Sequence, residues 1–290
     1  MKGMFDNMKE PIGVFDSGLG GISVLAQMII SLPQEKFLYF GDSLNAPYGE
    51  KTREEVLSFS MRISNKLIDR GSKALVVACN TATSAAIINL RNTFHLPVIG
   101  MEPAVKPAVN MKNIQRVVVM ATPFTLKEKK FHELVQNIDT DKEILELPCP
   151  GLVQLIEQEG GVGPKVHAYL VQLFESRSLG KGDVLVLGCT HYVFLTDLIE
   201  KILYNQVPLV HGNVGTVSEL KNQLKRNQIL ASEDINPHDE KSEYDLLNPF
   251  TKAQLQKRVQ LMNSHPDMVF DKLGWNLLLY ELEQLSKNSI

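Results

Sequence analysis

The sequence predicts an α/β fold with two similar domains, each built on a mainly parallel sheet flanked by helices. Short runs of Val, Ile and Leu, typical of strands buried on both faces, recur along the chain. A stretch with helical spacing of apolar residues follows most of these runs. The strand–turn–helix scheme repeats in the second half, so we expect the functional site in the cleft between the two domains.

The first half alternates strands and helices. A glycine-rich turn at 16–21 joins the first strand to the first helix, and Gly71 after the second helix is suited to a C-terminal cap. The strands are expected at 12–15, 37–40, 74–78 and 98–99, and the helices at 22–30, 53–70 and 82–92.

The second half follows the same scheme as far as residue 210. Its strands are expected at 117–120, 184–187 and 207–210, and its helices after residue 123 up to about 135 and at 152–158, 166–174 and 195–203. The segment 232–248 carries six acidic residues against one lysine, so we expect a solvated loop there. Helices are expected over 251–263 and 273–287, and Trp275 is expected in the core.

Composition excludes several classes of protein. The chain has 290 residues, 44% hydrophobic and 22% charged, which is typical of a folded globular protein rather than a disordered one. Its net charge of −3 argues against a general nucleic-acid binder. No apolar run approaches the roughly 18–20 residues of a membrane span, and the first ten residues lack a signal-peptide core. We expect a cytoplasmic protein that needs neither nucleic acid nor membrane.

Two cysteines occupy matching positions in the two halves. Cys79 lies in the run LVVACNT at 75–81, and Cys189 lies in VLVLGCTH at 184–191. Each follows a buried strand and precedes a helix, at the sheet edge where α/β proteins bind ligands. A helix N-terminus beside each thiol would favour the thiolate and lower its pKa from about 8.5. The alternative is two ordinary buried cysteines; for Cys149, which lies between two prolines, the structural interpretation is favoured.

Two facing thiols suit a reaction that inverts a carbon atom. Inversion removes a proton from one face and delivers another to the opposite face, which a single base cannot easily do. Asp16, at the end of a strand, could polarise Cys79 or hold a substrate ammonium group. His191 could act as an acid or base beside Cys189, and Glu157 could take part from the helix expected at 152–158. The alternatives are a structural histidine and a helix-surface carboxylate.

Other motifs do not point to a cofactor. The turn at 16–21 is not GxGxxG, and the GEKT at 49–52 lacks the upstream glycine of a phosphate-binding loop. Ser17 in that turn could simply cap the following helix. The histidines show no metal-ligand spacing, and no lysine stands in a convincing pyridoxal-phosphate setting. We therefore expect no metal and no cofactor.

Taken together, these residues resemble the cofactor-independent glutamate racemases of the aspartate/glutamate racemase family. The resemblance extends over roughly residues 11–212. Its motifs are FDSGLGG (15–21), YFGDSLNAPYG (39–49), ACNTAT (78–83), ATPFT (121–125) and GCTHY (188–192). It implies a buried site between two α/β domains, usually in a homodimer. The first domain would comprise 1–102 plus 213–290, and the second 103–212.

The resemblance also implies the residue roles. Cys79 would act on the D-isomer and Cys189 on the L-isomer, assisted by Asp16 and His191, with Glu157 near the second thiol. The residues implied to hold the substrate are Asp16, Ser17, Tyr48, Gly49, Asn80, Thr81, Thr122, Thr125, Thr190 and His191. The implied reaction converts L-glutamate to D-glutamate for peptidoglycan precursors in a bacterium.

The sequence departs from the family pattern at a few positions. Val193 stands where a proline is common, and His211-Gly212-Asn213 replaces a frequent Asp-Ser. The region after about 214 is longer than usual and shows no clear counterpart to the family's late strand. Two alternative functions stay open: a racemase for aspartate or another amino acid on the same scaffold, and a non-catalytic role in small-molecule or protein binding.

Overall fold

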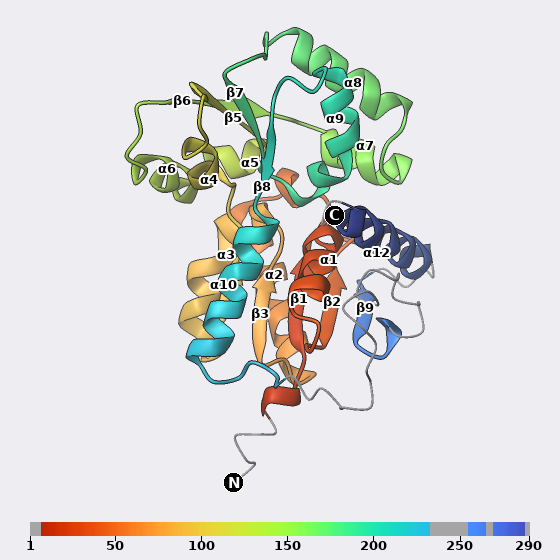
Figure 1. The fold of residues 1–290 in the computed structure, drawn as a ribbon. Coiled ribbons are helices and arrows are strands. Elements are labelled where there is room, and N and C mark those ends of the chain that lie inside the picture. Colours follow the sequence, from red (N-terminus) through yellow and green to blue (C-terminus); the bar gives the residue numbers. More distant parts are fainter. Residues whose placement is uncertain (1–6, 233–254, 265–268, 288–290) are drawn as a thin grey trace.

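The computed structural model describes residues 7–232, 255–264 and 269–287, which form two parallel sheets (Figure 1). The first sheet has the order β4-β3-β1-β2-β9 and consists of β1 (Ile12–Asp16), β2 (Phe37–Gly41), β3 (Ala74–Val77), β4 (Val98–Gly100) and β9 (Val259–Asn263). The second has the order β6-β5-β7-β8 and consists of β5 (Arg116–Ala121), β6 (Glu143–Pro148), β7 (Asp183–Leu187) and β8 (Leu209–His211). The predicted α/β class is confirmed.

Helices cover both faces of each sheet, and we call a sheet with its helices a lobe. The first lobe carries α1 (Ile22–Ser31), α10 (Asn213–Arg226) and α12 (Val269–Lys287) on one face and α2 (Arg53–Asp69) and α3 (Asn80–Thr93) on the other. The second lobe carries α4 (Val105–Val109), α5 (Pro123–Lys127), α6 (Lys129–Gln136), α7 (Leu152–Glu159), α8 (Pro164–Glu175) and α9 (Thr196–Ile202). Short 3₁₀ helices occupy Tyr48–Glu50 and Thr190–Leu195.

Alternation along the strands explains the two-layered core. Val14 and Tyr39 pack under α1, whereas Phe15 and Phe40, one residue later on the same strands, pack under α2 and α3. This follows from the period of two in a strand, which sends successive side chains to opposite faces. Trp275 is 5% exposed and packs in the α1 core, as predicted.

Local sequence signals fix the ends of several elements near the lobe interface. Thr52 and Glu55 form a capping box at the start of α2, with Thr52 Oγ1 accepting from Glu55 N at 3.2 Å and Glu55 Oε2 accepting from Thr52 N at 2.8 Å. Thr122 caps α5 with a single hydrogen bond, its Oγ1 accepting from Thr125 N at 3.2 Å, and Pro123 follows as the first helical residue. The loop after β2 contacts the start of α5, and Gly49 lies next to Thr122 there.

The carboxyl ends of the strands in the two sheets face each other across the lobe interface (Figure 1). Asp16 ends β1 and Cys79 follows β3 in the first lobe; Thr122 follows β5 and Cys189 follows β7 in the second. The predicted functional residues of both lobes therefore lie at the interface between the lobes. The exact domain boundaries at 102 and 212 stay a prediction.

The helix predicted at 273–287 is confirmed as part of α12, but the structure differs from the prediction at 259–263 and at one edge strand. A helix over 251–263 is wrong for its described end, because 259–263 is β9, which pairs in parallel with β2. A late strand is therefore present after all. Strand β6 and helix α10 were not predicted, since β6 lies at a sheet edge with half its residues exposed and lacks a buried apolar run. Apart from residue 232, the acidic segment 232–248 lies outside the described residues.

None of the helices within the described ranges is both long and apolar enough to span a lipid bilayer.

Candidate active site

Asp16 links the two lobes from the end of β1. Its side chain is fully buried, with Oδ1 accepting from Gly18 N at 3.0 Å and Oδ2 accepting from Thr190 Oγ1 of the second lobe at 3.0 Å. Burial raises the pKa of Asp16, although the positive charge of His191 and these two hydrogen bonds act against it. A carboxylate held this way is a suitable partner for a substrate ammonium group.

The glycines of the 16–21 turn allow the lobes to approach closely. A Cβ atom added to Gly20 would overlap Thr190 Oγ1 and the ring of His191, and one added to Gly18 would overlap the carboxylate of Glu157. Helix α1 begins only at Ile22, with Gly21 as its N-cap, so the interpretation of Ser17 as a helix cap is wrong. The turn serves as a contact surface between the lobes rather than as a cap.

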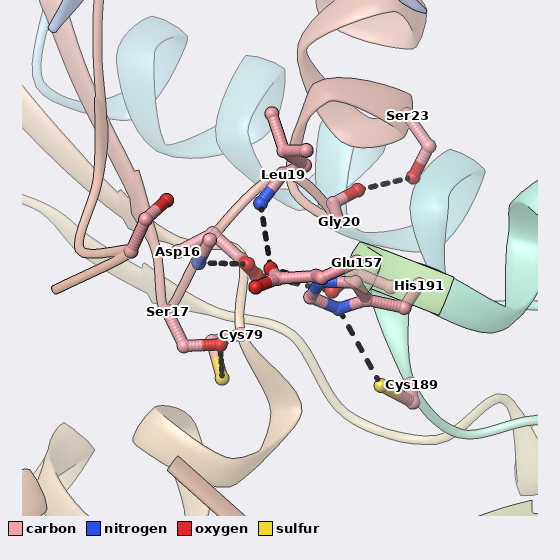
Figure 2. Close-up of polar contacts among 12 residues, drawn as sticks. Asp16, Ser17, Leu19, Gly20, Ser23, Cys79, Glu157, Cys189 and His191 are labelled. Carbon is pink, nitrogen blue, oxygen red and sulfur yellow. Dashed lines mark hydrogen bonds and ion pairs between the residues drawn. The ribbon is translucent and has the colours of Figure 1, made fainter. Parts of the chain in front are cut away.

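A chain of polar contacts runs from this turn to the second thiol (Figure 2). Leu19 N donates to Glu157 Oε1 at 3.4 Å, the same oxygen lies 2.9 Å from His191 Nε2, and His191 Nδ1 lies 4.0 Å from Cys189 Sγ. Burial alone would lower the pKa of His191, but its hydrogen bonds to Cys189 and Glu157 and their charges hold it well above the ordinary value. The imidazole is therefore charged at neutral pH.

Cys79 is the N-cap residue of α3. Its sulfur accepts from Ala82 N at 3.4 Å, and its thiol donates to Ser17 Oγ at 3.7 Å. The expected lowering of its pKa is wrong: burial, followed by the charge of Asp16, raises the pKa to about 12. Both effects exceed the stabilising contribution of the helix N-terminus. Cys79 is thus a protonated thiol at neutral pH.

The two thiols come from different lobes and are both almost buried, at 5% exposure for Cys79 and 8% for Cys189. In Figure 2 both sulfurs lie below the group of polar contacts, Cys79 beside Ser17 at one end and Cys189 under His191 at the other. The two thiols are close enough for the charge of Cys189 to contribute to the raised pKa of Cys79. Cys149 is also buried and donates to Leu147 O at 3.3 Å, in line with its structural interpretation.

Three threonine hydroxyls form a second cross-lobe cluster. Thr81 Oγ1 lies 3.1 Å from Thr122 Oγ1 and 3.3 Å from Thr125 Oγ1, and the latter two are 3.0 Å apart. All three side chains are buried. Hydroxyl groups both donate and accept, so this cluster can exchange its internal hydrogen bonds for those of a carboxylate ligand.

The remaining predicted residues lie nearby with their side chains engaged elsewhere. Tyr48 donates to Asp42 Oδ2 at 2.6 Å, and Asn80 Nδ2 donates to Met101 O at 3.5 Å. Gly49 faces Thr122, whose Cβ would be 3.2 Å from a Cβ placed on the glycine. The structure therefore brings Asp16, Glu157, Thr190 and His191 into direct contacts, and the members of the threonine cluster into contact with one another. The phenol of Tyr48 instead binds Asp42, which is not one of the predicted site residues.

Two buried polar residues of the 39–49 motif, Tyr39 and Asp42, were not among the predicted site residues. Tyr39 donates to Gly18 O at 2.7 Å, and Asp42 accepts from both Tyr48 and Asn45. Asp42 follows a buried strand in the same way as Asp16, which is a signal that could have identified it. For Tyr39 the signal was a tyrosine at a buried strand position, because a buried tyrosine hydroxyl usually makes a hydrogen bond.

A cavity of about 70 Å³ adjoins the threonine cluster. Its lining includes Gly49 from the first lobe and Thr122, Cys149 and Gln154 from the second. A larger cleft of about 740 Å³ lies away from the site, between α8 and α9, and contains none of the predicted residues. Within the described ranges, no three His, Cys, Asp or Glu side chains are grouped so that they could hold a metal ion.

Comparison with known proteins gives concordant matches. The family model described as Asp/Glu/Hydantoin racemase matches residues 24–220. A glutamate racemase of Clostridium botulinum (strain Okra / Type B1) is 48% identical over 224 residues, covering 77% of this chain and 87% of the relative. The glutamate racemase of Francisella tularensis in complex with D-glutamate has a TM-score of 0.72 at 27% identity, covering 94% of each chain. That of Thermus thermophilus in complex with beta-chloro-D-alanine has a TM-score of 0.71 at 30% identity, covering 93% of each chain.

Proposed function

Because the chain belongs to the Asp/Glu/hydantoin racemase family, we propose that it is a glutamate racemase that interconverts L- and D-glutamate with Cys79 and Cys189 as its acid and base. The observation that carries this proposal is the pair of nearly buried thiols, one from each lobe, at the carboxyl ends of strands in two different sheets. A binding protein would not need both thiols, whereas inversion of a carbon atom needs a base on each face.

The reaction balances as a pair of proton transfers. Starting from L-glutamate, the Cys189 thiolate removes the Cα proton and becomes a thiol. The resulting carbanion takes a proton from the Cys79 thiol on the opposite face, which yields D-glutamate and a Cys79 thiolate. The raised pKa of Cys79 supports this starting state, because it keeps that thiol protonated. The roles reverse for D-glutamate.

Charge on the substrate has partners in both lobes. Asp16 accepts from Thr190, and the substrate ammonium would take over this acceptor. The hydroxyls of Thr81, Thr122 and Thr125 would donate to the substrate carboxylates, together with Ser17 and Asn80. Backbone N–H groups at the start of α3 would stabilise the charge that develops when the Cα proton leaves.

His191 and Glu157 serve the Cys189 side. An imidazolium beside the sulfur can stabilise a thiolate, and the carboxylate of Glu157 at 2.9 Å keeps the ring charged and oriented. Asp16 occupies the corresponding place on the Cys79 side. The two halves of the site are thus chemically unlike, although the cysteines have equivalent settings in the sequence.

Incubation of the purified protein with L-glutamate in D₂O tests the proposal. A racemase incorporates deuterium at Cα and drives the optical rotation toward zero, whereas a binding protein leaves both unchanged. We expect Cys79→Ala and Cys189→Ala each to lower the rate by at least about 10³-fold without changing the thermal melt. Cys149→Ala is the matched control and should stay active. A Cys79 or Cys189 variant with near-normal turnover would rule out the two-thiol mechanism.

A second candidate is racemisation of aspartate or another amino acid in the same site. The side chains of glutamate and aspartate differ by one methylene, and a pocket distinguishes such pairs by only about 1–3 kcal/mol. Chiral analysis with the two substrates side by side decides this point. The ratio of their kcat/KM values gives the specificity directly.

The assembly and the cellular role complete the proposal. We infer a homodimer in the cytoplasm that supplies D-glutamate for peptidoglycan precursors, as the resemblance to glutamate racemases implies. Light scattering on the eluted protein measures the mass against the 32.5 kDa of one chain. A monomeric mass would remove the dimer from the proposal and leave the chemistry untouched.

A further inference from the structure

Tyr39 is a buried polar residue to which the reaction assigns no role. It lies on β2, between β1 and β9, and its side chain is fully buried. Its hydroxyl donates to Gly18 O at 2.7 Å, within the glycine-rich turn. Burial, followed by the charges of Asp16 and Glu157, keeps the pKa of the phenol well above its ordinary value, so it is always a donor.

The peptide group that Tyr39 binds is also the one that contacts Glu157. The Gly18 carbonyl and the Leu19 N–H belong to the same planar unit, and in a trans peptide they point in opposite directions. Leu19 N donates to Glu157 Oε1 at 3.4 Å, across the lobe interface. A donor that fixes the carbonyl on one side therefore fixes the direction of the N–H on the other.

The contacts continue without interruption to the second thiol. Glu157 Oε1 is 2.9 Å from His191 Nε2, and His191 Nδ1 is 4.0 Å from Cys189 Sγ (Figure 2). The same turn has a second fixed point, because Ser23 Oγ donates to Gly20 O at 3.0 Å. Asp16 Oδ1 also holds the turn by accepting from Gly18 N at 3.0 Å, so among these contacts only the Tyr39 hydroxyl binds the Gly18 carbonyl.

We propose that Tyr39 is a positioning residue for the Cys189 side of the reaction: its hydroxyl fixes the Gly18–Leu19 peptide, whose N–H holds Glu157 against His191. This inference rests on the proposed racemase function. It assigns to a strand of the first lobe a part in the proton transfer made by a thiol of the second lobe. A phenylalanine would fill the same space but would leave the Gly18 carbonyl without its buried donor.

Tyr39→Phe removes only the hydroxyl and is the direct test. We expect kcat/KM for glutamate to fall about tenfold, which is the rate equivalent of one lost hydrogen bond of ordinary strength. The fall must be equal for L- and D-glutamate, because enantiomers have equal free energies. Tyr169→Phe is the control, since its phenol also donates to a backbone carbonyl, Pro150 O at 3.1 Å, but lies outside the site.

Isotope effects distinguish positioning from general loosening of the fold. If proton transfer at Cys189 is slowed, the primary isotope effect on kcat/KM rises for L-glutamate deuterated at Cα and falls for D-glutamate deuterated at Cα. A purely structural defect moves both effects alike. In a Glu157→Ala background, Tyr39→Phe should cost less than about twofold, because its target is already absent.

Unchanged kcat/KM in Tyr39→Phe, parallel isotope effects, or full additivity with Glu157→Ala would each overturn the inference. Ser23→Ala is the second variant should Tyr39→Phe not fold, and it must show the same isotope pattern. A wild-type protein that exchanges no Cα proton would instead refute the racemase function itself. The two failures are therefore separate outcomes.

Discussion

The close approach of the two lobes at Gly20 predicts a large effect of a single added methyl group. The φ of Gly20 is not in the left-handed region, so backbone strain is not the reason for a glycine there. The obstacle is space: a Cβ would overlap Thr190 Oγ1, held 3.0 Å from Asp16, and the His191 ring, held 2.9 Å from Glu157. Neither group is the free end of a flexible side chain.

The size of the effect follows from this geometry. To restore ordinary contact, either the ring or the whole second lobe must shift by about 1 Å, and misplacement of that order costs about 10²-fold in rate. Overpacking a close-fitting contact costs about 1–3 kcal/mol of folding free energy. At about 2–4 °C per kcal/mol for a chain of this size, Gly20→Ala should lower Tm by about 2–12 °C.

Racemisation rate and thermal melting of Gly20→Ala measure both parts. Gly215→Ala is the matched control: Gly215 lies inside α10 with no atom within 4 Å of an added Cβ. It should keep full activity and gain about 0.5–1 kcal/mol in stability, because alanine is the better helix former. A Gly20→Ala protein with wild-type activity and Tm would show that the working enzyme does not need this contact.

Two further predictions concern the roles of Asp16 and His191 in proton transfer and the effect of Glu281 on stability. Asp16→Asn and His191→Asn should each lower kcat/KM by about 10²-fold. The primary isotope effect should rise for D-glutamate in Asp16→Asn and for L-glutamate in His191→Asn. If each variant changes the isotope effects of both enantiomers equally, neither residue assists proton transfer at one particular thiol. Burial of Glu281, followed by the charge of Asp197, raises its pKa to about 7. The stability that this protonated carboxyl contributes is present below about pH 4.5 and lost as the pH rises through 7. Glu281→Gln should therefore flatten the fall in Tm between pH 5 and 8 and gain about 1–3 kcal/mol at pH 8; parallel Tm curves would contradict this.

The sequence by itself was sufficient for features that depend on near neighbours. Buried strands such as 74–77 are short continuous apolar runs, and the capping box of Thr52 and Glu55 involves only the four residues 52–55. The placement of Cys79 and Cys189 after such strands was readable because ligand sites in parallel sheets form at the carboxyl ends. Patterns of this kind can be predicted because the residues that cause them are close together in the sequence.

Pairing partners at a sheet edge were not readable. Residues 259–263 have a spacing that suits a helix as well as a strand, and only the free edge of β2 decides between them. Strand β6 was missed for the same reason, since an edge strand with exposed residues lacks the apolar run of a central one. Tertiary hydrogen bonds outweigh local propensity at such positions.

The site itself required the tertiary structure. Asp16 and Thr190 are 174 residues apart in the chain, and no local pattern shows that their side chains meet. The pKa of Cys79 was expected to fall beside a helix N-terminus, but burial and the charge of Asp16 raise it. Residue types and their order along the chain are local properties, whereas contacts, desolvation and the sum of charges around a thiol depend on everything packed against it.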